Sequence, residues 1–573
     1  MITAARGRLI AGGLVALCGA VFAGALAYAV YAHFAVRVLP IDDGYIHLRY
    51  VRNILTGVGP VYNAGQRVMG SSSPLYVVWL TLLAWVTRAS DLPALAVRSN
   101  ALWYVGTMVC LAGVLRRMAG SWPVALLLAA GATLFSPMLS VSTGVMESYL
   151  WGTLVLGALW AEASRRARLA AALVGLAAVA RPEGLLLLGL WGLRWLVPPA
   201  KRAHVRQAAP SRSAAPVDVV PVKRIWWRTG LWGRSPATLA LALAPLVVWI
   251  AVSTPYYGSP IPHSVISKAS GLYLMPEGYV RRTLGELFRA WSGGGALGWN
   301  PPASTAASGG LISLAQTLLP WIAIVGVVAF RTSRREGAWA PVALLVLLAL
   351  FYMAGGTHLL EWYLPLIWVL WYPALFGGAA ALVRAAAEHL RQGDGAGWWA
   401  AVILPAALLA TVFVSGPARA AVELVRTPDV ATIVSDDPVR MRVLAYHAAA
   451  EWLNAQAPEG ARLGASEVGA LGWTYTGYVI DSCALVSAEA LQYIPVPMSQ
   501  RNYGGDGVIG KELVQDLQPE YVASMPTFAA KSIMIDPWFS AHYKQAATFR
   551  LPQELWGSTH VLVWERIDPP VER

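Results

Sequence analysis

Charged residues are scarce in this sequence. Asp, Glu, Lys and Arg make up 13% of the 573 residues, hydrophobic residues make up 57%, and the mean hydropathy is +0.52. Soluble proteins carry roughly 25% charged residues. The low charge content therefore excludes an ordinary soluble protein and predicts a polytopic α-helical membrane protein.

Cysteine is almost absent as well. Of the three cysteines, Cys18 and Cys110 lie in apolar segments, and Cys483 has no evident partner. None has the spacing of zinc ligands, and the number is too small for a disulfide scaffold. Internal repeats are not visible either, so the inverted-repeat organisation of many secondary transporters has no support.

The excess of basic residues reports membrane orientation rather than nucleic-acid binding. Arg6 and Arg8 precede an apolar run over residues 9–36. We interpret this run as an uncleaved membrane helix with a cytoplasmic N-terminus, although Ala25-Leu26-Ala27 leaves a cleavable signal peptide as an alternative. The loop over residues 198–235 holds eight Lys and Arg against one acid, which marks it as cytoplasmic.

The positive-inside rule, by which Lys- and Arg-rich loops stay on the cytoplasmic side, predicts about eleven spans with the C-terminus outside. The segment over residues 75–87 is too short to span and is expected to be re-entrant or interfacial. This orientation places the ionisable groups of several loops on one outer face. The expected spans cover residues 9–36, 95–115, 122–139, 149–163, a pair around an outer bend at 181–184, 236–253, 311–330, 340–354, 364–383 and 398–414.

The composition becomes that of a soluble protein after about residue 416. Residues 439–454 read as an amphipathic helix, and short β-like runs follow at 461–465, 478–481, 520–524 and 560–565. We therefore predict a transmembrane domain over residues 1–416 and an extracytoplasmic α/β domain over residues 417–573. The first domain includes outer loops over 37–74 and 254–308.

Two adjacent acids, Asp42 and Asp43, follow the first apolar run. Neighbouring side chains on a helix diverge by roughly 100°, so the two carboxylates are expected to do different jobs. The simplest alternative is a solvated helix start, where acids favour the helix dipole.

Six motifs follow one another along the chain. They are Asp42-Asp43-Gly44-Tyr45-Ile46 with Arg49, Tyr50, Arg52 and Asn53; Gly57-Val58-Gly59-Pro60-Val61-Tyr62-Asn63; Gly144-Val145-Met146-Glu147-Ser148; Arg181-Pro182-Glu183-Gly184; Lys268 in an outer loop; and Gly464-Ala465-Ser466-Glu467-Val468-Gly469-Ala470-Leu471-Gly472. In this order they resemble the GT-C glycosyltransferases, multi-span enzymes that use polyprenyl-phosphate sugars. The likeness is greatest to the terminal arabinofuranosyltransferases of mycobacterial cell-wall arabinan and their bacterial relatives, and it covers most of the chain. Ser71-Ser72-Ser73 departs from the Gly-Tyr-Thr of many relatives.

Glycosyl transfer needs a base for the acceptor hydroxyl and cations for the departing phosphate. We expect Asp42 to be the base, and Asp43 to orient its neighbour or to coordinate a metal ion. The resemblance implies that Glu147 contributes to the site. Whether Asp43 and Glu147 share Mg²⁺, Mn²⁺ or Ca²⁺, or the enzyme works without metal, stays open. The candidates for the donor phosphate are Arg181, Lys268, His263, Arg49 and Arg52, and those for substrate are Tyr62, Asn63, Glu183, His358, Glu361 and Tyr363.

Each candidate has a structural alternative. Glu147 can cap a span, Arg181 can reach toward headgroups with Glu183 as its structural partner, and Lys268 can be a solvated loop lysine. His358, Glu361 and Tyr363 can belong to an interfacial belt. His47 is expected to be structural.

The resemblance implies a bacterial plasma-membrane enzyme with its site on the extracytoplasmic face. Its expected partners are a polyprenyl-phosphate sugar, a glycan or glycoconjugate acceptor and membrane lipids. Arabinofuranose is the leading donor sugar, with mannose and other hexoses as alternatives. Two other classes stay open, a flippase for lipid-linked sugars and a structural scaffold of the cell envelope.

Overall fold

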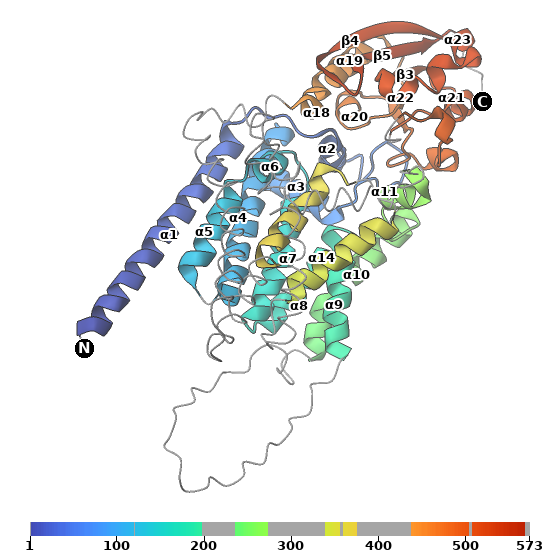
Figure 1. The fold of residues 1–573 in the computed structure, drawn as a ribbon. Coiled ribbons are helices and arrows are strands. Elements are labelled where there is room, and N and C mark those ends of the chain that lie inside the picture. The colour runs from blue at the N-terminus through green and yellow to red at the C-terminus, as the bar shows by residue number, and fades with distance from the viewer. Residues whose placement is uncertain are drawn as a thin grey trace, which may run out of the picture.

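The structure is a computed structural model that describes residues 2–119, 121–196, 235–272, 339–355, 359–374, 437–502 and 507–567. Within these residues a bundle of helices carries an α/β domain at one end (Figure 1). Three helices are long and apolar enough to cross a membrane: Ile10–Ala35, Leu92–Met118 and Pro236–Tyr257. The predicted spans at 311–330 and 398–414 lie outside the described residues, and that at 364–383 lies only partly inside them.

The bundle is built from helices that pack pairwise along their lengths. α4 packs on α7, α10 on α8, α7 on α8 and α1 on α5. Small residues at the contacts, such as Gly106 facing Thr153 and Gly152 facing Thr107, let these backbones approach closely. The bundle helices are α1 (Ile2–Ala35), α4 (Leu92–Ala119), α5 (Trp122–Thr133), α7 (Ser148–Ala163), α8 (Ala167–Ala180), α9 (Gly184–Leu196), α10 (Pro236–Tyr257) and α14 (Trp339–Ala354).

The predicted span over residues 122–139 is wrong in one respect, because it is not one helix. α5 ends at Thr133, and a separate short helix, α6 (Ser136–Ser142), follows. Pro137 explains the break, because it lacks the N–H that a continuous helix would use at this position. α6 leads into the outer turn that carries Glu147.

The short apolar segment forms α3 (Pro74–Thr87), a helix of 14 residues. At 1.5 Å per residue it is about 21 Å long, less than the thickness of a bilayer core. It leaves Trp85 and Val86 each 70% exposed. The segment is therefore a helix too short to span a bilayer core, and its interfacial or re-entrant placement stays a prediction.

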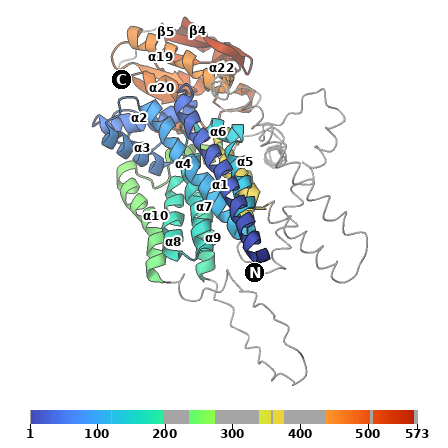
Figure 2. The same ribbon diagram turned by 90° about the vertical axis from the view of Figure 1, so that its left-hand side faces the viewer.

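Four short segments complete the end of the bundle that faces the C-terminal domain. They are α2 (Asp42–Leu55), α11 (His263–Ser267), η1 (Lys268–Leu272) and η2 (Glu361–Tyr363). Ile41 N donates to Gly144 O at 3.0 Å, so the start of α2 lies against the turn before α7. These segments therefore meet at one end of the bundle, beneath the C-terminal domain (Figures 1 and 2).

The C-terminal domain has a five-stranded sheet in the order β2-β1-β3-β5-β4. β1 pairs in parallel with β2 and β3, whereas β5 pairs antiparallel with β3 and β4. The four predicted strands are confirmed, and β4 is an addition. The strands are β1 (Arg462–Ala465), β2 (Tyr478–Asp481), β3 (Tyr521–Ser524), β4 (Tyr543–Leu555) and β5 (Ser558–Arg566), and the helices are α18 (Pro438–Met441), α19 (Val443–Gln456), α20 (Ala470–Thr474), α21 (Lys511–Leu517), α22 (Pro526–Ala529) and α23 (Pro537–His542).

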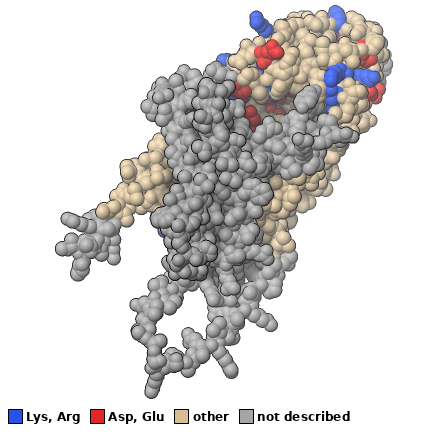
Figure 3. All heavy atoms as spheres, viewed as in Figure 1, with Lys and Arg blue, Asp and Glu red and all other residues tan. Residues whose placement is uncertain are grey.

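The turns that follow β1 and β2 face the bundle. Gly469 and Ala470, after β1, contact α2, while Cys483 and Ala484, after β2, contact α11. On the face drawn in Figure 3, charged side chains of the described residues gather over the C-terminal domain.

Candidate active site

α2 carries charged and polar side chains on two of its faces. Asp42, Tyr45, Arg49 and Arg52 recur at helical spacing and turn toward the C-terminal domain. His47 turns to the bundle, where it lies 3.3 Å from Glu147, and Asp43 lies under the influence of Lys268 and His47 from the membrane part and of Arg442 from the C-terminal domain. The two acids therefore have different surroundings, as their adjacency predicts.

Asp42 is buried and bound to the C-terminal domain. Its Oδ2 accepts a hydrogen bond from Gly469 N at 3.0 Å, and its Oδ1 accepts one from Ala470 N at 2.8 Å. Burial, together with the nearby Glu467, raises the pKa of the Asp42 carboxyl to about 7, although Arg442 opposes this. Both oxygens are already engaged, which argues against Asp42 as the base predicted for the acceptor hydroxyl.

Asp43 is half-buried, and its carboxylate has no hydrogen-bond partner in the part of the chain that the structure describes. Burial raises the pKa of the Asp43 carboxyl above its ordinary value. The opposing positive groups are Lys268, Arg442 and His47, in that order. A carboxylate that is free of hydrogen bonds among the described residues, and whose pKa burial raises, is suited to taking a proton.

Lys268, at the start of η1 and 225 positions after Asp43 in the chain, is the positive group with the largest influence on this carboxylate. Its Nζ donates a hydrogen bond to the Tyr363 hydroxyl at 2.8 Å. Burial alone would lower the pKa of the Lys268 ammonium, but Tyr363 and Asp43 raise it above its ordinary value. The lysine is therefore charged, and the alternative of a solvated loop lysine does not hold.

A buried ionic cluster lies next to this pair. Arg181 Nη1 donates to Glu147 Oε1 at 2.7 Å, while Arg181 Nε and Nη2 donate to Glu183 at 3.1 and 2.9 Å. His47 Nε2 lies 3.3 Å from Glu147 Oε2, and the Tyr352 hydroxyl donates to Glu183 Oε1 at 2.9 Å. Arg181 is thus shared between two carboxylates, which argues against the predicted phosphate role and favours the structural alternative for Glu183.

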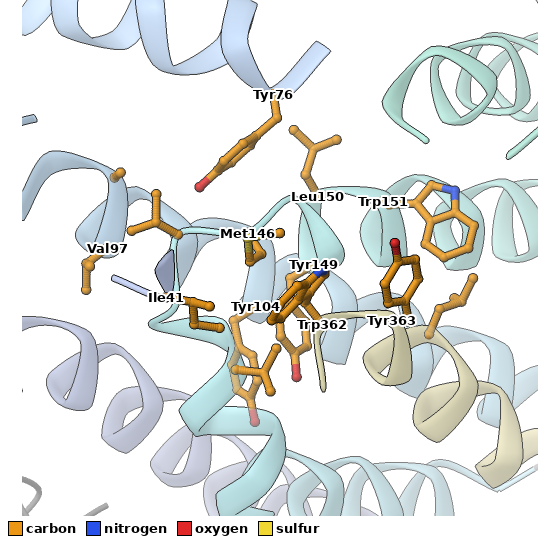
Figure 4. Close-up of a cluster of buried hydrophobic side chains, with 14 of the residues drawn as sticks. Ile41, Tyr76, Val97, Tyr104, Met146, Tyr149, Leu150, Trp151, Trp362 and Tyr363 are labelled. Atoms are coloured by element: carbon orange, nitrogen blue, oxygen red, sulfur yellow. The ribbon is translucent and has the colours of Figure 1, made fainter. Parts of the chain in front are cut away.

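Aromatic rings pack against this ionic cluster. The Arg181 guanidinium lies 4.7 Å from the centroid of the Tyr363 ring and 5.4 Å from that of Trp151. Figure 4 shows Tyr363 and Trp151 beside each other, with Trp362 and Tyr149 next to them. Tyr363 therefore contacts both Arg181 and Lys268, which joins the ionic cluster to the Lys268 ammonium.

Arg49 and Arg52 do not face the membrane. Arg49 Nη1 donates to Gly472 O, and its Nη2 donates to Gly477 O at 3.2 Å. Arg52 Nη1 donates to Trp473 O at 2.6 Å and stacks on that ring. Because both guanidinium groups bind carbonyls of the C-terminal domain, their predicted role at the donor phosphate is at odds with the structure.

Tyr62 and Asn63 also belong to the contact between the two parts. The Tyr62 hydroxyl donates to Val468 O, and the side-chain amide of Asn63 exchanges two hydrogen bonds with the backbone of Val479, at 2.8 and 3.1 Å. A Cβ on Gly472 would lie 1.7 Å from the Tyr62 hydroxyl, so only glycine fits there. These residues join two domains, and their predicted role in binding substrate is not supported by their contacts.

The remaining candidates divide between three places. His263 Nδ1 lies 2.8 Å from Ala484 O, so this histidine joins α11 to the C-terminal domain rather than facing a phosphate. Glu361 is exposed at the start of η2. His358 lies outside the described residues.

The cation site predicted for Asp43 and Glu147 does not fit these surroundings. No cluster of three His, Cys, Asp or Glu side chains suited to a metal occurs within the ranges that the structure describes. Glu147 is bound to Arg181, and Asp43 faces the Lys268 ammonium. A divalent cation would meet one free carboxylate beside a positive charge.

His47 contributes more to the site than the sequence indicates. Its Nδ1 lies 2.8 Å from Ser71 Oγ and its Nε2 lies near Glu147, so it connects α2 to the turn before α7. The available signal is its position four residues after Asp43, which places both on one helix face. Tyr352 offers no comparable signal, because it lies in an apolar helix.

Two curated proteins are similar to this chain in sequence. The terminal β-(1→2)-arabinofuranosyltransferase of Corynebacterium glutamicum is 29% identical over 273 residues, which cover 44% of this chain and 36% of that protein. The protein of the same name from Mycobacterium tuberculosis is 35% identical over 125 residues, which cover 21% of this chain and 20% of that protein. The matches therefore span little more than a third of the first relative and a fifth of the second. Residues 436–564 match a family described as a domain of unknown function (DUF8728).

The crystal structure of ArnT from Cupriavidus metallidurans bound to undecaprenyl phosphate has a similar fold. The TM-score is 0.52 at 14% identity, and the alignment covers 97% of this chain and 98% of ArnT. The apo state of the same protein gives a TM-score of 0.51 over the same shares. Both the bundle and the C-terminal domain are therefore included in the likeness, and the chain has the GT-C fold that the order of its motifs predicts.

Proposed function

We propose that the chain is a membrane glycosyltransferase that moves a sugar from a polyprenyl-phosphate donor to a hydroxyl of a cell-envelope glycan or glycoconjugate. One observation carries this proposal: at the end of the bundle beneath the C-terminal domain, the Asp43 carboxylate has no hydrogen bond among the described residues and lies within the electrostatic influence of Lys268, which the Tyr363 hydroxyl holds at 2.8 Å. Transfer from a phosphate ester to a hydroxyl needs a base and a cation at one place. The similarity to two arabinofuranosyltransferases supports the same reaction class.

In this proposal Asp43 replaces Asp42 as the base. The acceptor oxygen attacks the anomeric carbon, and its proton passes to the Asp43 carboxylate. The bond between the anomeric carbon and the phosphate oxygen breaks, and the electron pair leaves with the polyprenyl phosphate. The Lys268 ammonium, oriented by the Tyr363 hydroxyl, meets the charge that develops on the phosphate.

The proposed donor sugar is arabinofuranose, because both curated relatives are named for its transfer. Mannose or another hexose would use the same base and cation. The proposed site lies on the extracytoplasmic face of a bacterial plasma membrane, under the C-terminal domain. The lipid would enter from the membrane side and the glycan from the aqueous side.

The test uses the full-length protein in liposomes, with polyprenyl-phosphate arabinofuranose and a short arabinan acceptor. We expect sugar transfer by the wild type and a loss of roughly 10²–10⁴-fold in kcat for Asp43→Asn, because asparagine cannot take the proton. Asp536→Asn is the matched control, since Asp536 binds Gln515 within the C-terminal domain. Parallel reactions with mannose and hexose donors identify the sugar.

Two results would contradict the proposal. Transfer that survives Asp43→Asn would remove this carboxylate as the base. Movement of the labelled lipid across the bilayer, without sugar transfer by the wild type and unaffected by Asp43→Asn, would instead identify a flippase.

A further inference from the structure

The C-terminal domain contacts both segments that carry the proposed site, the helix with Asp43 and the segment with Lys268. It binds the acid-bearing helix through Gly469 and Ala470, which donate to Asp42. It also binds the lysine-bearing segment on both sides of Lys268. The contacts there are His263 Nδ1 with Ala484 O, Ser267 Oγ with Cys483 O, and Arg501 Nη1 and Nη2 with Leu272 O and Gly271 O.

The contact at Asp42 is closely fitted. A Cβ on Gly469 would lie 1.7 Å from the Asp42 backbone oxygen and 2.6 Å from the carbon of its carboxylate. Gly469 has φ −70° and ψ −84°, so space rather than a left-handed backbone requires glycine at this position. The first turn of α2 therefore has one orientation against the C-terminal domain.

Asp42 is the residue directly before Asp43 in that turn. Any rotation of α2 that breaks the two hydrogen bonds of Asp42 also turns Asp43 away from Lys268, because the two residues share a rigid helical turn. A carboxylate bound by two backbone N–H groups is a strong anchor. In contrast, Asp43 has no hydrogen bond among the described residues that could hold it in place.

We propose that Asp42 is a positioning residue, which fixes the Asp43 carboxylate by anchoring α2 to the Gly469–Ala470 turn of the C-terminal domain. This inference rests on the proposed function. In this proposal the C-terminal domain anchors α2 at the site, whichever acceptor the enzyme uses.

The test compares the full-length variants Asp42→Asn and Asp42→Ala with the wild type. Asparagine keeps one oxygen that accepts a backbone N–H, whereas alanine keeps none. We expect a graded loss of kcat, roughly tenfold for asparagine and 10²-fold for alanine, because misplacement of about 1 Å costs that much. KM for the donor lipid should change by less than about twofold, since Lys268 is retained.

A base would behave differently from a positioning residue. If Asp42 were the base, asparagine and alanine would be equally inactive, and the acidic limb of the pH–rate profile would disappear in both. For a positioning residue the acidic limb persists in both variants. Equal, complete loss would therefore overturn the proposal, as would wild-type kcat in both.

Gly469→Ala changes the same contact on the side of the C-terminal domain. It keeps the proposal testable if the Asp42 variants fail to fold. It should lower kcat like Asp42→Ala, and the double variant should lose no more than either single variant. Asp91→Asn is the matched control, because Asp91 accepts a backbone N–H at 3.0 Å within its own helix start. Additive losses would contradict a shared anchor.

These outcomes separate the inference from the proposed function. If Asp43→Asn is inactive while the Asp42 and Gly469 variants behave as wild type, the inference fails and the function stands. If Asp43→Asn keeps its activity, the proposed function fails.

Discussion

Arg181 and Glu147 form a buried ion pair of 2.7 Å between residues 34 positions apart. Their side chains are 3% and 0% exposed. Burial would raise the pKa of the Glu147 carboxyl, but Arg181 and His47 lower it to about 2. The pair is therefore ionised at any physiological pH, and it fixes the outer ends of α7 and α8 against each other.

Glu147→Gln should destabilise the fold rather than act on donor binding. Breaking a buried ion pair from one side costs about 3–5 kcal/mol, because the remaining charge loses its partner. We expect a fall in melting temperature in detergent, together with a loss of folded protein. Glu361→Gln is the control, since Glu361 is exposed. A variant with normal melting temperature and a raised KM for the donor would instead return Glu147 to a substrate role.

The pH dependence of transfer should respond to Lys268. A base acts in its ionised form, so activity rises as pH increases through the pKa of Asp43, which burial raises. Lys268 lowers this pKa, so its removal in Lys268→Gln should move the acidic limb of kcat/KM to higher pH.

The position of the limb, not the maximum rate, is the informative quantity here. Lys268→Gln also loses a cation for the phosphate, which reduces the rate at every pH. Lys544→Gln is the control, since Lys544 pairs with Glu565 in the sheet at 3.0 Å. A limb that stays in place or moves to lower pH would show that Lys268 does not act on the base.

Short local runs in the sequence of the C-terminal domain predict four of its five strands, β1, β2, β3 and β5. β4 escaped prediction because its exposed strand reads as polar and contains Pro552, which indicates an edge or no strand. The adjacency of Asp42 and Asp43 predicted divergent roles but not which acid faces which domain. That assignment depends on Ala470, which is 428 positions from Asp42.

The roles of two arginines could not be predicted from the sequence alone. Arg49 and Arg52 on an outer helix are equally compatible with a phosphate and with backbone carbonyls, because guanidinium groups bind both. Only the docked C-terminal domain separates the two roles. The positions of the basic clusters along the chain predict one face for Glu147, Arg181 and Lys268, and the structure brings these residues together at one end of the bundle.

Arg440 should be essential for docking of the C-terminal domain. Its buried guanidinium donates to Leu39 O at 3.1 Å and to Thr143 Oγ1 and Thr143 O at 2.9 Å each. Arg440→Met keeps much of the volume but loses these bonds, so the domain should open more often. Hydrogen exchange of the Gly469 and Ala470 amides should then become several-fold faster.

Arg462→Met is the matched control for that experiment. Arg462 binds Gln518 O at 3.1 Å and lies 3.4 Å from Glu520, both within the C-terminal domain. Its removal should leave exchange at Gly469 and Ala470 unchanged. If Arg440→Met also leaves this exchange unchanged, the contact with the bundle does not depend on Arg440.

The hydroxyl and the ring of Tyr363 have different main contacts. The hydroxyl accepts a hydrogen bond from Lys268 Nζ, whereas the ring centroid lies 4.7 Å from the Arg181 guanidinium and 5.6 Å from Lys268 Nζ. Tyr363→Phe should keep the melting temperature within a few degrees and raise KM for the donor lipid, because Lys268 loses the group that orients it. Tyr363→Leu also removes the ring, and it should lower the melting temperature because the cation–π contact is lost. If both variants lowered the melting temperature equally and left KM unchanged, the hydroxyl would have no part in holding Lys268 for the phosphate.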